Sequence, residues 1–235
     1  TLDLHISMLR NWIGSTGIPL AEIPAVPFGY KFFASLTHDV DFAGIRRHKF
    51  DHTMWGFIYR AVVGSAVAFL HGRIRFAKLW INWMAVLKLP FVFAGIADDF
   101  WEHFDKYTDI ENGLSSTFFL IPFKNQTGSH VSNKNLYKRA VKYDVGDIGE
   151  QIKHLLKLGF EIGLHGIDAW GSADKGSQEM KRVVEVTGQK EIGVRMHWLC
   201  YDHQSPFLLE QAGFGYDATL GYNETIGFRN GTVQV

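Results

Sequence analysis

Short apolar runs alternate with helical patterns through much of this chain, and this alternation restricts the possible folds more than any other feature. The runs cover residues 31–37, 116–121, 160–165, 192–195 and 214–217. Helical patterns separate the later runs, over residues 145–158, 177–187 and 205–213. Each helical pattern stops at or just before a glycine, which is a common end signal for a helix. Alternation of strand and helix predicts βα units and a parallel sheet or barrel.

One long stretch, residues 44–112, interrupts this order because it is helical in pattern and rich in Trp and Phe. We expect a helical insertion after the first strand, not a separate domain, since one strand cannot close a core. Residues 1–30 predict a helix and a proline-punctuated linker, which leaves 31–235 as the main domain. The most apolar stretch, residues 55–70, contains Arg60 and is shorter than the roughly 20 residues that span a bilayer. We therefore predict an amphipathic helix and no transmembrane span.

The composition excludes some classes of function. Basic and acidic residues are equal in number, 24 of each, so the basic surface that nucleic-acid binding needs is not predicted. The single cysteine, Cys200, excludes an intramolecular disulfide and a CxxC metal site. No charged-then-apolar leader begins this sequence, so no signal peptide is expected within it. The compartment stays open, with the cell envelope or another extracytoplasmic site as the working expectation.

Polar residues that follow the predicted strands are the candidates for chemistry. In parallel α/β folds, reactive groups gather where strands end and loops begin. Four sets occupy such places: His38, Asp39 and Asp41; His165 and Asp168; Arg195, His197 and Trp198; and Asp217.

The pair Asp39 and Asp41 lies in the segment Leu-Thr-His-Asp-Val-Asp, directly after the first apolar run. Two carboxylates at i and i+2 repel each other unless a cation or hydrogen-bond donors compensate. A divalent metal resolves this repulsion by binding one carboxylate and leaving the other as a base toward water. The alternative interpretation is an Asx turn at the end of a strand.

The other sets have a functional and a structural interpretation each. His165 would complete a ligand set of oxygen and imidazole, or serve as a buried structural histidine. Asp168 is a further ligand or a loop cap. Arg195 would orient a carboxylate and keep it ionised, or pair with an acid for stability alone. Trp198 and Tyr201 would stack on a sugar ring or, more commonly for aromatic side chains, pack in the core.

Taken in order, five segments resemble the polysaccharide deacetylases of the NodB type, grouped as carbohydrate esterase family 4. The segments are residues 35–41, 116–120, 159–166, 193–198 and 213–220. The resemblance covers about residues 31–232 apart from the helical insertion. It implies an α/β fold, a distorted (β/α) barrel of about seven strands, with a divalent-metal site at the strand ends. The implied activity is metal-dependent hydrolysis of acetyl groups from N-acetylated sugars of a polysaccharide or glycan.

By position, the resemblance gives each candidate a role. It implies Asp39 as the catalytic base, Asp41 and His165 as metal ligands, and Arg195 as the residue that orients the base. Trp198 would shape the pocket for the acetate group. The implied metal is zinc first, with cobalt or another divalent ion as alternatives. The implied partner is an acetylated carbohydrate.

The sequence departs from the family pattern at three points. Val40 separates two aspartates that are adjacent in common members, although i and i+2 side chains share one face of an extended chain. Ala169 stands where the family has a second metal-binding histidine, which leaves Asp168, His197 or a water as the third ligand. A C-terminal Leu-x-His, which supplies the family's general acid, is missing. An incomplete barrel would expose strand edges, so we expect the sequence to be C-terminally incomplete.

These departures keep two other functions open. One is hydrolysis of another non-peptide C–N bond on a small molecule, because the Asp-x-Asp variant also occurs in relatives of that sort. The other is a catalytically degenerate pseudoenzyme that binds carbohydrate or a membrane surface without turnover. The tryptophans of residues 54–101 would form a lid, an oligomer contact or an interfacial helix, or pack in the core.

Overall fold

The computed structural model describes residues 2–19, 21, 26, 28–32, 34–129, 140–222 and 229. Within them a parallel sheet forms the centre, with its strands in the order β1-β2-β3-β4-β5. The strands are β1 (Leu36–Asp39), β2 (Ser116–Leu120), β3 (Glu161–Gly166), β4 (Gly193–Met196) and β5 (Tyr216–Asp217). Each strand pairs with the next one along the chain, as successive βα units do in a barrel. The described residues include no pairing of β1 with β5, so the seven-stranded barrel stays a prediction.

All five predicted strands are present, but the first begins later than predicted. The prediction placed it at residues 31–37, whereas β1 starts at Leu36. Phe32 is 74% exposed and lies outside the sheet, so the apolar character of this run does not reflect burial. The predicted linker before it lies partly outside the described residues, and the predicted N-terminal helix is α1 (Leu2–Ser15).

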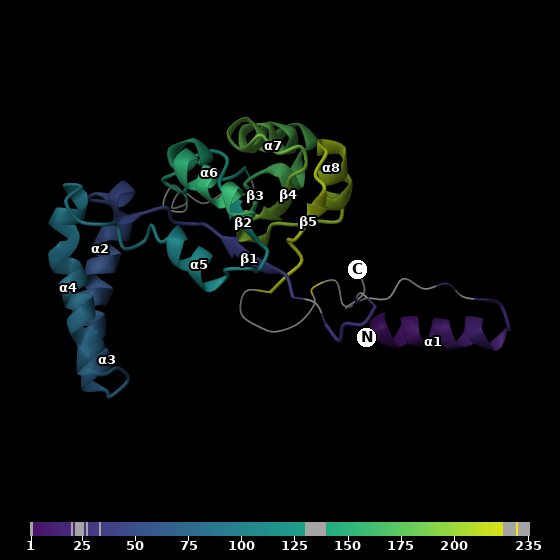
Figure 1. The fold of residues 1–235 in the computed structure, drawn as a ribbon, viewed down its shortest axis with the longest axis horizontal. Coiled ribbons are helices and arrows are strands. Elements are labelled where there is room, and N and C mark those ends of the chain that lie inside the picture. The colour runs from purple at the N-terminus through teal and green to yellow at the C-terminus, as the bar shows by residue number, and fades with distance from the viewer. Residues whose placement is uncertain are drawn as a thin grey trace.

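Three helices connect the strands and gather on one side of the sheet (Figure 1): α6 (Gly149–Lys157), α7 (Ala173–Thr187) and α8 (Ser205–Ala212). Helix α6 follows the 3-10 turn η4 (Val145–Ile148), which Asp144 caps at its first residue. Helix α7 begins four residues before the prediction because Ser172 accepts a hydrogen bond from the Lys175 N–H and caps it. Helices α7 and α8 end at Gly188 and Gly213, whose left-handed φ values of 70° and 96° stop a helix.

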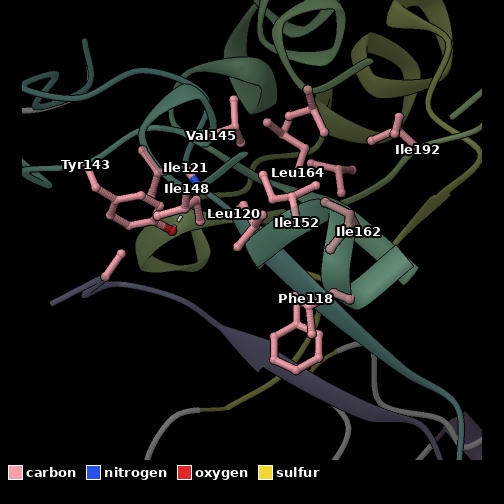
Figure 2. Packing of buried hydrophobic residues seen from close by; sticks show 14 of the residues in the cluster. Phe118, Leu120, Ile121, Tyr143, Val145, Ile148, Ile152, Ile162, Leu164 and Ile192 are labelled. Carbon is pink, nitrogen blue, oxygen red and sulfur yellow. Dashed lines mark hydrogen bonds between the residues drawn. The ribbon is translucent and has the colours of Figure 1, made fainter. Parts of the chain in front are cut away.

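The main core lies between the sheet and these helices (Figure 2). Alternate strand residues supply it, since neighbouring side chains of a strand point to opposite faces. They are Phe118 and Leu120 of β2, Ile162 and Leu164 of β3, and Val194 and Met196 of β4. The intervening residues of the same strands therefore face the other side of the sheet, where polar side chains collect.

The insertion between β1 and β2 is helical, as predicted. It contains η1 (Ile45–His48), α2 (His52–Tyr59), η2 (Arg60–Gly64), α3 (Ser65–Leu70), α4 (Phe76–Phe93) and α5 (Phe104–Ile110). Elements α2, η2 and α3 form one continuous helix that packs beside α4, and this hairpin projects away from the sheet (Figure 1). The continuous helix covers 19 residues, so the sequence-based argument that this stretch is too short to cross a bilayer was wrong.

Candidate metal and catalytic site

Parallel pairing brings the candidate residues to one edge of the sheet. Asp39 is the last residue of β1 and lies opposite Phe119 of β2. Two strands further along, His165 of β3 lies opposite Arg195 of β4. Val40 packs against the main core, while Asp39 and Asp41 on either side of it contact groups of the polar face. His165 and Arg195 thus lie near Asp39 at the carboxyl ends of the strands, although they are at least 126 positions away from it in the sequence.

Gly163 leaves space for the Phe119 ring, on which the Arg195 side chain packs. A Cβ atom at Gly163 would lie 2.6 Å from the ring of Phe119, so only glycine lets that ring lie across β3. The guanidinium of Arg195 sits over the same ring, with its Cζ atom 4.7 Å from the centroid. This contact supports the position of a charged side chain that reaches back from β4 to β1.

Arg195 holds Asp39 directly. Its Nη1 atom donates to Asp39 Oδ1 at 3.0 Å and to Thr37 Oγ1 at 2.9 Å, and its Nε atom donates to the Ala218 carbonyl at 3.0 Å. Two acceptors on β1 and a carbonyl just after β5 therefore set the orientation of the guanidinium. A permanently charged donor in this place orients the Asp39 carboxylate.

Three potential ligand atoms converge beside Asp39. Asp41 Oδ1 lies 3.5 Å from His165 Nε2 and 3.3 Å from His197 Nδ1, and the two imidazole nitrogens are 3.0 Å apart. Both histidines are buried, at 3% and 8% exposure. A tetrahedral zinc site with bonds of about 2.0–2.1 Å would hold its ligand atoms about 3.3 Å from each other. The spacing of these three atoms fits such an ion and leaves a fourth position open.

The protonation pattern supports the same interpretation. His165 Nδ1 lies 3.1 Å from the Arg195 carbonyl oxygen, which can only accept a hydrogen bond. The proton of a neutral His165 therefore belongs on Nδ1, and its Nε2 atom offers a lone pair toward Asp41 and His197. A carbonyl behind the imidazole is the usual outer support of a metal-binding histidine.

Asp41 Oδ1 is a buried acceptor that receives no hydrogen bond, although 46% of the side chain is exposed. Burial raises the pKa of this carboxyl, but His165 and then His197 lower it, and the net pKa lies below its usual value. A buried carboxylate oxygen without a donor is costly, and a cation between it and the two imidazoles would satisfy it.

The backbone is strained directly after His197, the first residue that follows β4. Trp198 and Leu199 have φ values of 60° and 52°, a left-handed conformation that bulky side chains rarely adopt. Each such residue costs about 1–3 kcal/mol, and strain of this kind concentrates at functional sites. The same turn places the Trp198 ring against the His197 imidazole, with centroids 3.9 Å apart.

Of the two residues predicted as alternative third ligands, only His197 joins the group. Asp168 instead accepts hydrogen bonds from the Ser129 N–H and hydroxyl at 2.7 and 2.9 Å and from Lys175 Nζ at 2.8 Å. The Asp168 carboxylate therefore binds Ser129 and Lys175 and is not part of the group around Asp41. Ala169, where the family pattern has a histidine, is fully buried in the main core.

Two cavities border the site. One of about 370 Å³ includes Asp39 and Asp41 in its wall, and one of about 220 Å³ includes Asp41, His197 and Trp198. Trp198 therefore lies where a substrate-contacting residue was predicted, whereas Tyr201 lines neither cavity. The role of both residues in binding stays a prediction.

The wall of the larger cavity also includes side chains of the insertion that the sequence did not single out for this site. Trp101, His103 and Tyr107 of the insertion line it together with His38. His38 Nε2 is 2.8 Å from Glu111 Oε1, and the Ser116 hydroxyl donates to Glu111 Oε2 at 2.7 Å. No pattern in the sequence relates residues 101–111 to the end of β1, because only the return of the insertion to the sheet places them there.

Glu179 of α7 was not predicted either, and it anchors the segment that follows His165. Its carboxylate accepts hydrogen bonds from the Ile167 and Asp168 N–H groups at 2.9 and 2.8 Å. Burial raises the pKa of Glu179 to about 7, with a contribution from the charge of Asp168, against the lowering effect of the backbone donors. The side chain is only 3% exposed.

Replacing Glu179 by alanine should lower the free energy of unfolding by about 3 kcal/mol, because buried N–H donors lose their acceptor. Urea denaturation measures this change. Glu185 on the same helix is a matched control, since it is 67% exposed and its ion pair with Arg182 is long at 3.6 Å. Glu185→Ala should change stability by no more than about 0.5 kcal/mol. Equal stability of the two variants would contradict the anchoring role.

Comparison with family models finds no match for this sequence, and comparison with curated proteins finds no significant match. Among solved structures, the chain is similar to the crystal structure of a "putative polysaccharide deacetylase from Mycobacterium smegmatis", with 19% sequence identity and a TM-score of 0.40. The similarity covers 85% of this chain and 56% of that chain, so this chain spans little more than half of that structure's length.

Proposed function

We propose that this chain is a metal-dependent hydrolase that removes acetyl groups from N-acetylated sugars of a polysaccharide or glycan. The observation that carries the proposal is the convergence of Asp41 Oδ1, His165 Nε2 and His197 Nδ1 next to a carboxylate held by Arg195. The order of the sequence motifs supports the reaction class. Closure of the sheet into a seven-stranded barrel, and a general acid from a further segment, belong to the same proposal.

In this proposal Asp41, His165 and His197 hold one divalent ion, with zinc as the first candidate. A metal bound there supplies a Lewis acid that polarises an acyl oxygen and makes water more acidic. Asp39 accepts the proton of the attacking water, and its hydrogen bond from Arg195 Nη1 holds the carboxylate in position. The Arg195 carbonyl oxygen, 3.1 Å from His165 Nδ1, orients the His165 imidazole toward Asp41 and His197.

The walls of the larger cavity suit a sugar. Trp101 and Tyr107 offer aromatic faces, and His103 and His38 offer polar groups. Sugar rings present apolar C–H faces that pack on aromatic side chains, while their hydroxyls need hydrogen-bond partners. Asp39 and Asp41 form one wall of the same cavity, so a ring bound there would present its substituent to the proposed catalytic groups.

A second candidate is hydrolysis of another non-peptide C–N bond on a small molecule. The size of the larger cavity, about 370 Å³, favours it, because pockets for small ligands commonly measure about 300–1,000 Å³. The two functions share the metal group and Asp39, and they differ only in what occupies the cavity.

We expect the purified protein supplied with Zn²⁺ or Co²⁺ to release acetate from N-acetylglucosamine oligomers, and we expect EDTA to abolish the release. Coupled enzymatic detection of acetate measures the rate, and re-addition of the metal should restore it. Faster turnover of a single N-acetylated sugar or another small amide than of the oligomers would favour the second candidate. A protein that binds metal and acetylated oligomers but releases no acetate would be the carbohydrate-binding pseudoenzyme.

A further inference from the structure

The hairpin of residues 52–93 exposes many large apolar side chains along both of its helices. On α4, five of the six exposed large apolar side chains recur every three or four residues and so share one face: Phe76, Trp80, Trp83, Leu87 and Phe91. The sixth is Ile81, which lies outside this spacing. The companion helix adds a second exposed group: Trp55, Tyr59, Val62, Val63, Val67 and Leu70. A contiguous apolar surface of this kind marks an interaction site on a folded protein.

The inner side of the hairpin is already packed, so the exposed faces are not the result of a poorly formed pair of helices. Leu79, Leu89 and Val92 of α4 are at most 5% exposed. Trp83 Nε1 donates to the Val62 carbonyl at 3.4 Å, which ties the two helices together. Leu89 and Val92 join Ile45 in a small core of their own at the base of the hairpin.

The composition of the hairpin suits a lipid environment. Its two helices contain 19 and 18 residues, and both are apolar enough by composition to lie in a membrane, with only 17% of the tested windows buried. The hairpin also projects clear of the sheet and of α6, α7 and α8, as Figure 1 shows.

The charges of the hairpin indicate which kind of bilayer it would meet. Residues 52–97 contain no Asp or Glu at all, but they contain Arg60, Arg73, Arg75, Lys78 and Lys88. All five basic side chains are exposed. Lys78 and Lys88 lie on α4 itself, outside the aromatic face. Long basic side chains beside an apolar helix face reach toward anionic headgroups while the face enters the acyl region.

A groove at the base of the hairpin extends the apolar surface. It has a volume of about 460 Å³ and is lined mainly by apolar side chains, among them Met54, Ile58 and Leu89. Lys49 and Phe50 also line it, and Phe50 is 72% exposed. A groove with apolar walls and a basic residue has the chemistry to take the acyl chain of an anionic lipid.

We propose that the hairpin docks this protein onto a bilayer that contains anionic lipids, with the aromatic face of α4 entering the interface. Arg60 and Lys88 argue for an interfacial position along the membrane plane, because a charged side chain at the centre of the hydrocarbon costs about 2.5–3.5 kcal/mol or more. The proposal uses no residue of the metal group and is independent of the proposed function.

Flotation with vesicles tests the docking. The full chain should float with vesicles of phosphatidylcholine and phosphatidylglycerol, and the bound fraction should fall at least tenfold with phosphatidylcholine alone. Removing two basic residues, Arg73→Gln with Arg75→Gln, should weaken binding to the anionic vesicles at least tenfold, since each contributes through the surface potential. Brominated lipid should quench tryptophan fluorescence of the bound protein, as insertion requires.

The aromatic face has its own variant and a matched control. Trp80→Ser, Leu87→Ser and Phe91→Ser together should reduce the bound fraction at least tenfold, and circular dichroism should show an unchanged melting temperature because these side chains are exposed. Phe207→Ser with Leu158→Ser removes exposed apolar groups elsewhere and should leave binding as it is. The proposal fails if the full chain stays unbound, or if the triple variant floats like the parent. It also fails if the triple variant only converts a dimer into a monomer.

Discussion

Replacing Asp41, His165 or His197 by alanine is expected to abolish stoichiometric binding of a divalent metal. The three ligand atoms lie 3.0–3.5 Å from one another, and each supplies one of only three protein donors in the group. Loss of an outer partner of a ligand already costs about 10- to 100-fold in metal affinity, so loss of a ligand should cost more than a hundredfold. Equilibrium dialysis followed by elemental analysis measures the metal that each variant retains.

Asp168→Ala is the matched control for this series. The sequence left Asp168 and His197 as alternative third ligands, and the carboxylate of Asp168 is bound to Ser129 and Lys175. The Asp168 variant should therefore keep its metal while losing some stability. Retention of metal by His197→Ala together with loss by Asp168→Ala would overturn the assignment of the third ligand. Retention by the Asp41 and His165 variants would overturn the site as a whole.

Asp39→Asn is expected to lower the rate of acetate release by about 10²- to 10⁴-fold, the usual contribution of a general base. The amide has nearly the same shape, and its oxygen can still accept the hydrogen bond from Arg195 Nη1, but it cannot take a proton from water. Metal content should stay at the parent level because Asp39 is not one of the three converging ligands. The rate and the metal content are measured on the same preparation.

The Arg195→Lys variant tests how much the orientation of Asp39 by Arg195 contributes to the rate, apart from proton transfer by Asp39 itself. Lysine keeps the positive charge but has no planar fork, so it cannot reach Asp39, Thr37 and the Ala218 carbonyl together. This variant should lose activity by a smaller factor than Asp39→Asn, and its rate should depend differently on pH. Activity of Asp39→Asn within threefold of the parent would show that another group acts as the base.

Local patterns predicted the strands and helix ends because the determinants lie within a few residues of each other. Gly188 and Gly213 end helices through their own backbone conformation. The shared side of Asp39 and Asp41 likewise follows from the alternation of an extended chain, with Val40 packed into the core between them. The late start of β1 escaped prediction because an apolar run before a strand looks the same whether it is buried or, like Phe32, exposed.

The sequence alone thus determined the parallel α/β class, the helical insertion and the carboxylate pair at the end of the first strand. Tertiary structure decided the partners of that pair. His197, the first residue after β4, lies 3.3 Å from Asp41 Oδ1, whereas the carboxylate of Asp168 is hydrogen-bonded to Ser129 and Lys175. The cavity wall from the insertion and the outward aromatic faces of the hairpin depend equally on contacts distant in sequence. Periodicity identifies which side chains share a face, whereas packing of the whole chain determines what that face meets.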